Sequence, residues 1–180
     1  FIGGGNMAQA IVLGLLKQGY PAAQIIVNDP NEDKRAFFAH LGVQTAENNA
    51  ESAGRADVVL LAVKPQMMAE ACQPLNAVNF ADKLLISIAA GISTARLQTL
   101  IPTATSTVRV MPNTPALVGE GMAGLFAAKN TAETDRTFAE DLLSAVGKTV
   151  WVEDEDHMHA ITAASGSSPA YFFLMLEAMQ

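Results

Sequence analysis

The fold is decided by the first eight residues of the chain, which read Phe1-Ile2-Gly3-Gly4-Gly5-Asn6-Met7-Ala8. This string fits the pattern G-x-G-x-x-A between the end of an apolar strand and the start of a helix. There the first glycine permits a tight turn, the second lets the backbone approach a pyrophosphate, and the small Ala8 lets helix and strand pack closely. N–H groups at the helix start would face the phosphates. The string predicts a dinucleotide-binding βα unit; the alternative is a glycine turn in an unrelated βα unit.

Beyond this loop, strands alternate with helices. The pattern predicts strands at residues 24–28, 57–63, 84–88 and 106–110, with helices at about 6–18, 33–41 and after Pro65. Gly19 and Gly42 stand where the first two helices should stop. Residues 58–63 are apolar throughout, which is typical of a parallel strand covered on both faces. The alternation predicts an α/β fold with a Rossmann-type doubly wound sheet.

After Pro112 the rhythm changes, and two further strands, at 122–127 and 148–152, enclose a helix at about 131–145. From residue 154 onward only helices are expected. We therefore expect a dinucleotide-binding domain at residues 1–152 and the start of a helical unit at 153–180. The first residues look like the end of a strand and the last ten like an unfinished helix, so a fragment is expected.

Composition narrows the function. Half of the 180 residues are hydrophobic and 16% are charged, a balance that excludes a disordered chain. The net charge of −7 repels nucleic acid and anionic membrane surfaces, so neither is an expected partner. Uninterrupted apolar runs such as residues 58–63 are far shorter than the roughly 20 residues that cross a bilayer. A single cysteine, Cys72, forms no internal disulfide and favours a cytoplasmic location.

Asp29 lies about 20 residues after the loop, where an acidic side chain can accept hydrogen bonds from the adenosine ribose. Asp29-Pro30 also suits the first two positions of a β-turn, and both roles can hold at once. A carboxylate here would repel a 2′-phosphate and favour NAD. Lys34 and Arg35, one helical turn further on, would instead supply the cations that NADP needs. These residues leave NAD or NADP open as the cofactor.

Five strings occur in order along the chain: the glycine loop of residues 1–8, Ala62-Val63-Lys64-Pro65-Gln66, Ser87-Ile88-Ala89-Ala90-Gly91-Ile92, Arg109-Val110-Met111-Pro112-Asn113-Thr114-Pro115-Ala116, and Ser165-Gly166-Ser167-Ser168-Pro169-Ala170-Tyr171. Together they resemble pyrroline-5-carboxylate reductase over the whole chain. The resemblance implies a Rossmann domain followed by an all-helical domain through which subunits interlock as a homodimer or larger homo-oligomer. Most of that second domain, and a glycine-rich loop ending in Ala-Thr that holds the substrate carboxylate, would lie beyond Gln180. Ser168 stands where the family often has glycine.

The resemblance also implies roles for individual residues. For the cofactor these are Ile2, Gly3, Gly4, Gly5, Asn6 and Met7 at the pyrophosphate, Asn49 near the adenosine, Ala62, Val63, Lys64 and Pro65 at the ribose and nicotinamide, and Ala89, Ala90 and Gly91 at the nicotinamide end. For the substrate they are Glu155 near the ring nitrogen, and Asn113, Ser165, Gly166, Ser167 and Ser168. The implied reaction is hydride transfer from NAD(P)H to the C=N carbon of 1-pyrroline-5-carboxylate, giving L-proline.

Local patterns refine these roles. Ser168-Pro169 suits the N-cap and first position of a helix, whose free N–H groups would attract a carboxylate; the alternative is that the serines only cap and turn. Lys64, at the carboxyl edge of a parallel strand, lies where ligands bind in such sheets, or else is a surface lysine before a proline-started helix. His157 and His159, two apart, fall on different helix faces, so no metal site is expected.

Two other functions compete with imine reduction. Another NAD(P)-dependent imine or hydroxy-acid reductase of similar architecture would be expected to carry a catalytic lysine in its helical domain, and residues 154–180 contain no lysine. A non-catalytic dinucleotide-binding module would not need the second polar string at Ser165 to Tyr171. No catalytic acid is assigned, because a protonated cyclic imine accepts hydride readily and positioning carries most of the catalysis.

Overall fold

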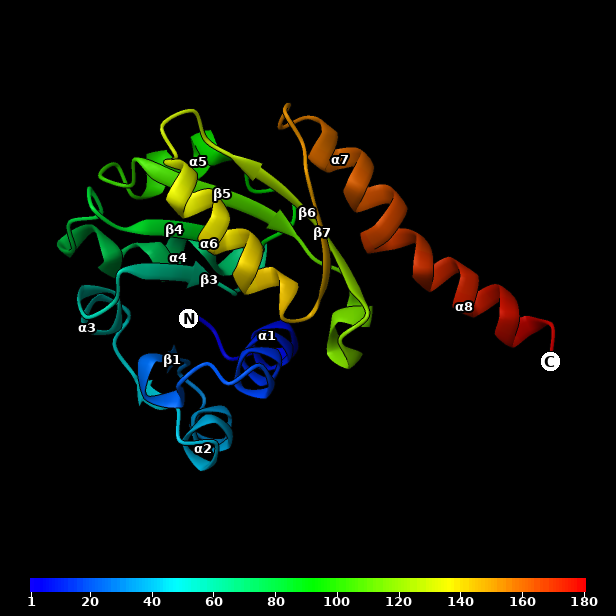
Figure 1. The fold of residues 1–180 in the computed structure, drawn as a ribbon, viewed down its shortest axis with the longest axis horizontal. Coiled ribbons are helices and arrows are strands. Elements are labelled where there is room, and N and C mark those ends of the chain that lie inside the picture. Colours follow the sequence, from blue (N-terminus) through cyan, green and yellow to red (C-terminus); the bar gives the residue numbers. More distant parts are fainter.

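The computed structural model describes residues 1–180 as a twisted sheet wrapped by helices, with a helical arm that leaves the body (Figure 1). The strands are β1 (Ile26–Asn28), β2 (Gln44–Ala46), β3 (Val58–Leu61), β4 (Leu84–Ser87), β5 (Ser106–Met111), β6 (Gly121–Ala127) and β7 (Gly147–Trp151). β1 pairs with β2, and β3 to β7 form five strands in sequence order. Ile2 joins the two sets through parallel bridges to Asn28 and Leu61. One residue beside the glycine loop therefore connects both halves of the sheet.

Strand direction decides where the loops gather. β1 and β2 are parallel, as are β3, β4 and β5, so their carboxyl ends share one edge. β6 runs antiparallel to β5, and β7 runs parallel to β6. The chain thereby turns back after β5, and the helical arm returns along the β6 side of the sheet. The predicted doubly wound α/β fold is confirmed.

Helices cover both faces of the sheet. The α-helices are α1 (Asn6–Lys17), α2 (Glu32–His40), α3 (Asn49–Gly54), α4 (Met68–Cys72), α5 (Thr94–Leu100) and α6 (Glu133–Ser144). Short 3-10 turns supplement them: η1 (Ala22–Gln24), η2 (Pro65–Met67), η3 (Pro74–Ala77) and η4 (Thr114–Val118). One core contains side chains of α1, α2 and α6, and the other contains side chains of α3, α4 and α5. On β3, Leu60 enters the first core while Val59 and Leu61 enter the second. This alternation explains why the strand is apolar throughout.

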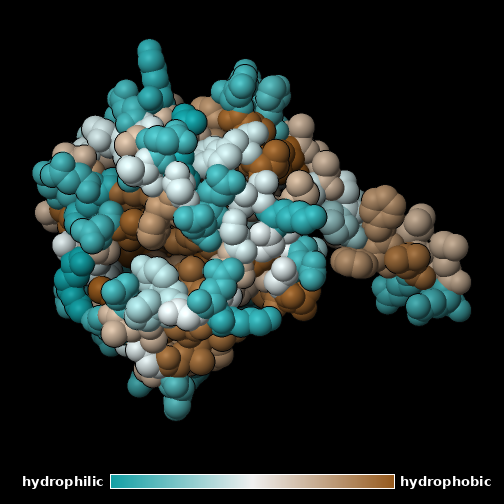
Figure 2. Space-filling model, in the orientation of Figure 1, coloured by the Kyte–Doolittle hydropathy of each residue, from teal (hydrophilic) through white to brown (hydrophobic).

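The C-terminal arm consists of α7 (His157–Ile161), a π-helical turn (Thr162–Ser167) and α8 (Ser168–Ala178), which follow one another as a continuous rod (Figure 1). Figure 2 shows hydrophobic side chains along the protruding part. On α8 the side chains of Tyr171, Phe172, Phe173, Leu174, Met175 and Leu176 are each at least half exposed. Exposed apolar surface of this extent is typical of a face that another protein surface covers.

The expected helix start at Ser168-Pro169 is wrong. Ser167 has helical backbone angles, φ −102° and ψ −40°, and makes no side-chain cap. The Ser168 hydroxyl instead donates to the Ala163 carbonyl at 2.6 Å. The helix has already begun at His157, so proline here follows a wider π turn that tolerates its missing N–H. Residues 165–168 therefore do not present a free helix N-terminus to a carboxylate.

Most other expected elements are present within one or two residues of the predicted ends. Gly19 and Gly42 stand just beyond α1 and α2 with φ of 88° and 77°, as helix-ending glycines should. The short elements β2, α3 and α5 were not predicted, because each has too few residues for a periodic pattern. No helix is both long and apolar enough to cross a membrane.

Candidate functional site

Four loops meet at the carboxyl edge of the parallel strands. They comprise residues 3–5 after Ile2, 62–65 after β3, 88–93 after β4 and 112–113 after β5. Residue 29 follows β1 at the same edge. In open α/β sheets ligands bind outside this edge, so the topology brings most of the predicted site residues together. A cavity of about 960 Å³ lies elsewhere, at the amino-terminal ends of β1, β2 and β3, and residues of α1, α3 and α6 also line it. None of residues 3–5, 62–65 or 88–93 line this cavity.

Each glycine of the loop meets a different constraint. Gly3 has φ 102°, and a Cβ there would lie 2.7 Å from the Ala62 carbonyl oxygen. A Cβ on Gly4 would lie 2.9 Å from the Phe38 ring. Gly5 differs, because its φ is −75° and a Cβ would meet nothing within 4 Å. The first two positions need glycine for the fold, whereas Gly5 leaves space beside the start of α1, where the sequence predicts a pyrophosphate.

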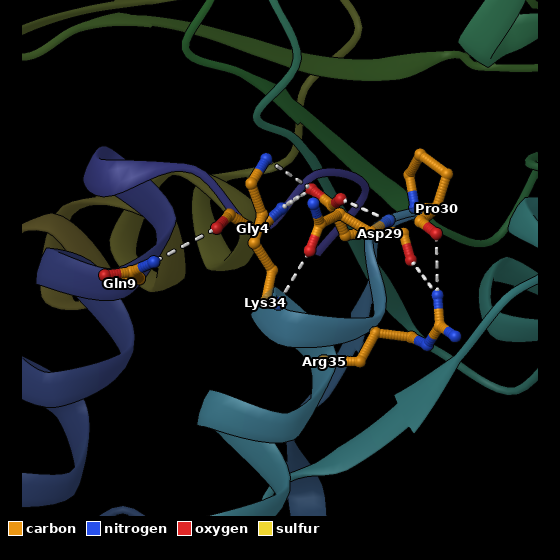
Figure 3. A network of polar contacts seen from close by, with 7 residues as sticks. Gly4, Gln9, Asp29, Pro30, Lys34 and Arg35 are labelled. Atoms are coloured by element: carbon orange, nitrogen blue, oxygen red, sulfur yellow. Dashed lines mark hydrogen bonds and ion pairs between the residues drawn. The ribbon is translucent and has the colours of Figure 1, made fainter.

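Asp29 holds the glycine loop through side-chain hydrogen bonds (Figure 3). Its Oδ2 accepts hydrogen bonds from the Gly4 N–H at 2.8 Å and from the Lys34 ammonium at 3.1 Å, and its Oδ1 accepts from the Asn31 N–H at 2.9 Å. Burial by itself raises the pKa of Asp29, but these hydrogen bonds and the charge of Lys34 outweigh it and lower the pKa. The Asp29 side chain thus holds the bend at Pro30 through the Asn31 N–H, whereas the β-turn and the ribose contact stay predictions.

Lys34 and Arg35 differ in how many of their side-chain N–H donors are already used within the chain (Figure 3). The Arg35 guanidinium donates to the Asp29 and Pro30 carbonyls at 2.7 and 3.0 Å and to the Glu47 carboxylate at 2.7 Å. The Lys34 ammonium has one hydrogen-bond acceptor, Asp29, and its side chain is 43% exposed. An ammonium carries three donors, so Lys34 keeps two for a ligand while Arg35 mainly holds the turn.

The remaining predicted cofactor residues follow β3 and β4 or, for Asn49, begin α3. Their contacts with a dinucleotide stay predictions. Lys64 is exposed and directly precedes the proline-started turn η2. Gly91 has φ 73°, and the Ala89 N–H donates to the Ser87 hydroxyl. Asn49 is half-buried, and its side-chain amide donates to the Ala71 carbonyl at 2.9 Å. That amide links α3 to the end of α4, which leaves its carbonyl oxygen for the predicted adenosine contact.

A second cluster forms where the arm crosses β5 and β6. The Asn113 side-chain amide donates to the Ser165 hydroxyl at 2.8 Å. A Cβ on Gly166 would lie 2.6 Å from the Met111 methyl group, and a Cβ on Gly124 would lie 2.3 Å from Ile161 Cδ1. Two glycines thus let the arm lie directly on the sheet. η4, which follows Asn113, packs against α1, the helix that begins directly after the glycine loop.

Glu155 fastens the beginning of the arm. Its carboxylate accepts the Thr94 N–H and hydroxyl at 2.8 Å each and the Arg109 guanidinium at 3.1 Å. Burial raises the pKa of Glu155, but the hydrogen bonds from Thr94 and Arg109 and the charge of Arg109 outweigh it, so the pKa lies below its usual value. The sequence analysis gave no role to Thr94 or Arg109. An arginine between Val108 and Val110 on a buried strand was the available signal, since a buried charge needs a partner.

Two family models match separate parts of the chain. Residues 1–91 match the family described as NADP oxidoreductase, coenzyme F420-dependent. Residues 155–180 match the family described as pyrroline-5-carboxylate reductase dimerisation.

Over its whole length the chain is 81% identical to the pyrroline-5-carboxylate reductase of Haemophilus influenzae, of which it covers 66%. A solved pyrroline-5-carboxylate reductase structure from Coxiella burnetii matches with a TM-score of 0.93 at 42% identity, over 99% of this chain and 67% of that one. The chain belongs to the pyrroline-5-carboxylate reductase family. The Plasmodium falciparum pyrroline carboxylate reductase, solved with NADP bound, is similar at a TM-score of 0.87 and 29% identity, over 99% of this chain and 65% of that one. The chain thus spans about two thirds of the length of these reductases.

Replacement of Gly5 tests the dinucleotide loop of this family member. Gly5→Val fits the existing φ and the open space, so the fold should be retained, while the branched side chain blocks the approach of a pyrophosphate. We expect NADPH affinity, followed by the fluorescence of the reduced nicotinamide, to fall at least about 100-fold. Gly54→Val is the matched control, because a Cβ at Gly54 also meets nothing within 4 Å. Unchanged affinity in Gly5→Val would place the cofactor elsewhere.

Replacement of Glu155 tests the fastening of the arm. Glu155→Gln leaves the buried Arg109 without its counter-charge and should cost about 2 kcal/mol, a Tm decrease of roughly 4 to 8 °C at pH 7. Because the folded-state pKa lies below the usual 4.5, the wild-type advantage is complete above that value and decreases as the pH falls below it. Thermal unfolding at several pH values measures both effects. Glu153→Gln, at an exposed neighbour, is the control, and an equal loss there would contradict the assignment.

Proposed function

We propose that this chain serves the NAD(P)H-dependent reduction of 1-pyrroline-5-carboxylate to L-proline. The observation that carries the proposal is that two groups lie at the carboxyl edge of the parallel strands: the open loop at Gly5 and, after β5, Asn113 with its partner Ser165 on the arm. Membership of the reductase family, with 81% identity to the Haemophilus influenzae enzyme, supplies the substrate.

The residues present fit a nicotinamide dinucleotide. Gly5 and the start of α1 offer N–H groups and space for a pyrophosphate, and Lys34 offers a free cationic donor near the end of β1. The predicted contacts at Ala62 to Pro65 and Ala89 to Gly91 lie at the ends of the next two strands. When bound, the reduced nicotinamide supplies the hydride. The chain's own work is to orient the imine and to shield it from water.

The polar groups of the arm would hold the imine. Ser165, whose oxygen accepts the Asn113 side-chain N–H, offers a hydroxyl at this part of the sheet that can position the substrate carboxylate. Glu155 lies further back, and three donors already occupy its oxygens. A carboxylate has about four lone-pair sites, so one remains for an N–H of the protonated ring. Because an iminium accepts hydride readily, these residues need to orient and stabilise it, and none must act as a strong acid.

The helical arm suggests how the molecule is assembled. We assign residues 1–152 to the dinucleotide-binding domain and 153–180 to the start of a helical dimerisation domain. The exposed apolar side chains of α8 support burial against another subunit in a homodimer or larger homo-oligomer. The free thiol of the single, buried Cys72 supports a cytoplasmic location.

The cofactor preference can be tested at Lys34. With two spare donors, Lys34 is placed to bind a 2′-phosphate, and Asp29, which already binds Lys34 and the Gly4 N–H, does not repel that phosphate as a free carboxylate would. Lys34→Gln should weaken NADPH affinity about 10- to 100-fold, because a charge-assisted hydrogen bond is lost. NADH affinity should stay within about twofold, since NADH has no 2′-phosphate. Lys17→Gln, at the far end of α1, is the control.

Two outcomes would decide against this use of Lys34. An equal loss for both cofactors would make Lys34 only a partner of Asp29, and no loss for either would remove it from the site. Arg35→Gln should differ by weakening both cofactors together, because it releases the Asp29 and Pro30 carbonyls that shape the turn. Asp29 itself is a less informative target, since its replacement also removes the acceptor of the Gly4 N–H.

The proposed reaction is tested by assaying this chain beside a protein of the relatives' full length that carries it. We expect both to bind NADPH, and the longer protein alone to reduce pyrroline-5-carboxylate efficiently. The short chain should be slower by at least about a thousandfold, because it lacks part of the predicted carboxylate clamp and the partner surface of α8. Light scattering on both proteins measures assembly. Full activity of the 180-residue chain as a monomer would overturn the shared-site proposal.

A further inference from the structure

Asn113 links three separate parts of the molecule. It directly follows the loop proline after β5 and directly precedes η4. Its Oδ1 accepts the Met122 N–H at 2.9 Å, at the start of β6, and its Nδ2 donates to the Ser165 hydroxyl on the arm at 2.8 Å. The Asn113 side chain is half-buried, and its bond to Ser165 is partly shielded from water.

The Met122 bond fixes which way the Asn113 amide points. A backbone N–H can only donate, so the atom that faces Met122 must be the amide oxygen. The amide nitrogen is then directed at Ser165. Because this nitrogen can only donate, the Ser165 oxygen accepts, and its own proton must point away from Asn113.

Ser165 differs from two nearby hydroxyls of the arm, those of Thr162 and Ser168. Thr162 donates to the Met158 carbonyl at 2.7 Å and Ser168 donates to the Ala163 carbonyl at 2.6 Å, so both hydroxyls are used inside the helix. Ser165 only accepts, and its proton has no acceptor within the chain. The half-buried Ser165 oxygen is held in place, since Gly166 lies against Met111 one residue further on.

We propose that Asn113 is a positioning residue that orients the Ser165 hydroxyl as a donor to the carboxylate of the substrate. The inference rests on the proposed imine reduction and deepens it by assigning Asn113 an indirect role. The Asn113 side-chain N–H donates to the Ser165 oxygen. The Ser165 proton is therefore directed away from Asn113, toward the sheet edge that holds the proposed substrate site. The π turn contributes by placing Ser165 beside Asn113, on the side of the arm that faces the sheet.

The test is Asn113→Asp in a protein of the relatives' full length that carries this chain. Aspartate has the shape of asparagine and still accepts the Met122 N–H, but its carboxylate has no donor. Ser165 then turns its proton to the new carboxylate and no longer offers it to the substrate. We expect KM for pyrroline-5-carboxylate to rise at least about 10-fold. NADPH affinity should stay within about twofold and kcat should fall much less than KM rises, since the cofactor loop is untouched.

A double-mutant cycle separates orientation from charge repulsion. Ser165→Ala should raise KM about as much as Asn113→Asp, and the double variant should resemble Ser165→Ala alone, because Asn113 acts through Ser165. If the double variant is additive, the new carboxylate repels the substrate directly and the positioning role is overturned. An unchanged KM in Asn113→Asp overturns it as well.

A second variant covers loss of folding. Should Asn113→Asp lower Tm by more than a few degrees, Asn113→Ala enters the same cycle. Asn113→Ala is expected to raise KM in the protein that keeps Ser165. It should have no further effect on KM in the protein that already carries Ser165→Ala, and an effect in both proteins would overturn the proposal. The unmodified protein distinguishes the two levels of inference. If it binds NADPH but reduces no pyrroline-5-carboxylate, the proposed function fails; if it is active and the cycle shows no coupling, only the role of Asn113 fails.

Discussion

The hydrogen bond from the Gly4 N–H to the Asp29 carboxylate is the contact on which the rest of the site depends. It ties the glycine loop to the end of β1 at the point where Ile2 alone bridges the two parts of the sheet. Asp29 in turn holds Lys34, and the carbonyl of Asp29 holds Arg35. One buried carboxylate thus sets the loop, the following turn and the position of the nearby cations. This arrangement explains how an acidic residue at the end of β1 is compatible with a phosphate-bearing cofactor.

The arm is attached by a different kind of contact at each level of the sheet. Glu155 binds Thr94 and Arg109 through charge-assisted hydrogen bonds, Ile161 fits against Gly124 by shape, and Ser165 meets Asn113 through a neutral hydrogen bond. The strongest polar contact lies at the base of the arm and the most adjustable one at the proposed substrate site. The arm is therefore anchored at its base, while a single orientable hydroxyl remains for the ligand.

The sequence predicted the βα loop and the longer strands because their signals are local. Gly3 needs a positive φ, Ala8 must be small, and the apolar run at residues 58–63 follows from burial on two faces. The same local reasoning failed at Ser168-Pro169. A serine before a proline is a good helix start by itself, but the helix of the arm had already begun at His157 and reaches these residues through the π turn of Thr162–Ser167. Local propensity was overridden by a helix in progress.

By itself, then, the sequence determined the fold class, the place of the glycine loop and which polar residues stand after which strand. Only the tertiary structure decided what those residues bind. Gly4, Asn113 and Thr94, which bind Asp29, Ser165 and Glu155, lie 25, 52 and 61 residues away from them along the chain. Sequence periodicity reports which face of an element is buried, whereas a hydrogen-bond partner depends on how distant elements pack. The direction of the Ser165 proton is the clearest case, because it follows from a backbone N–H on β6 that no pattern around residue 165 could indicate.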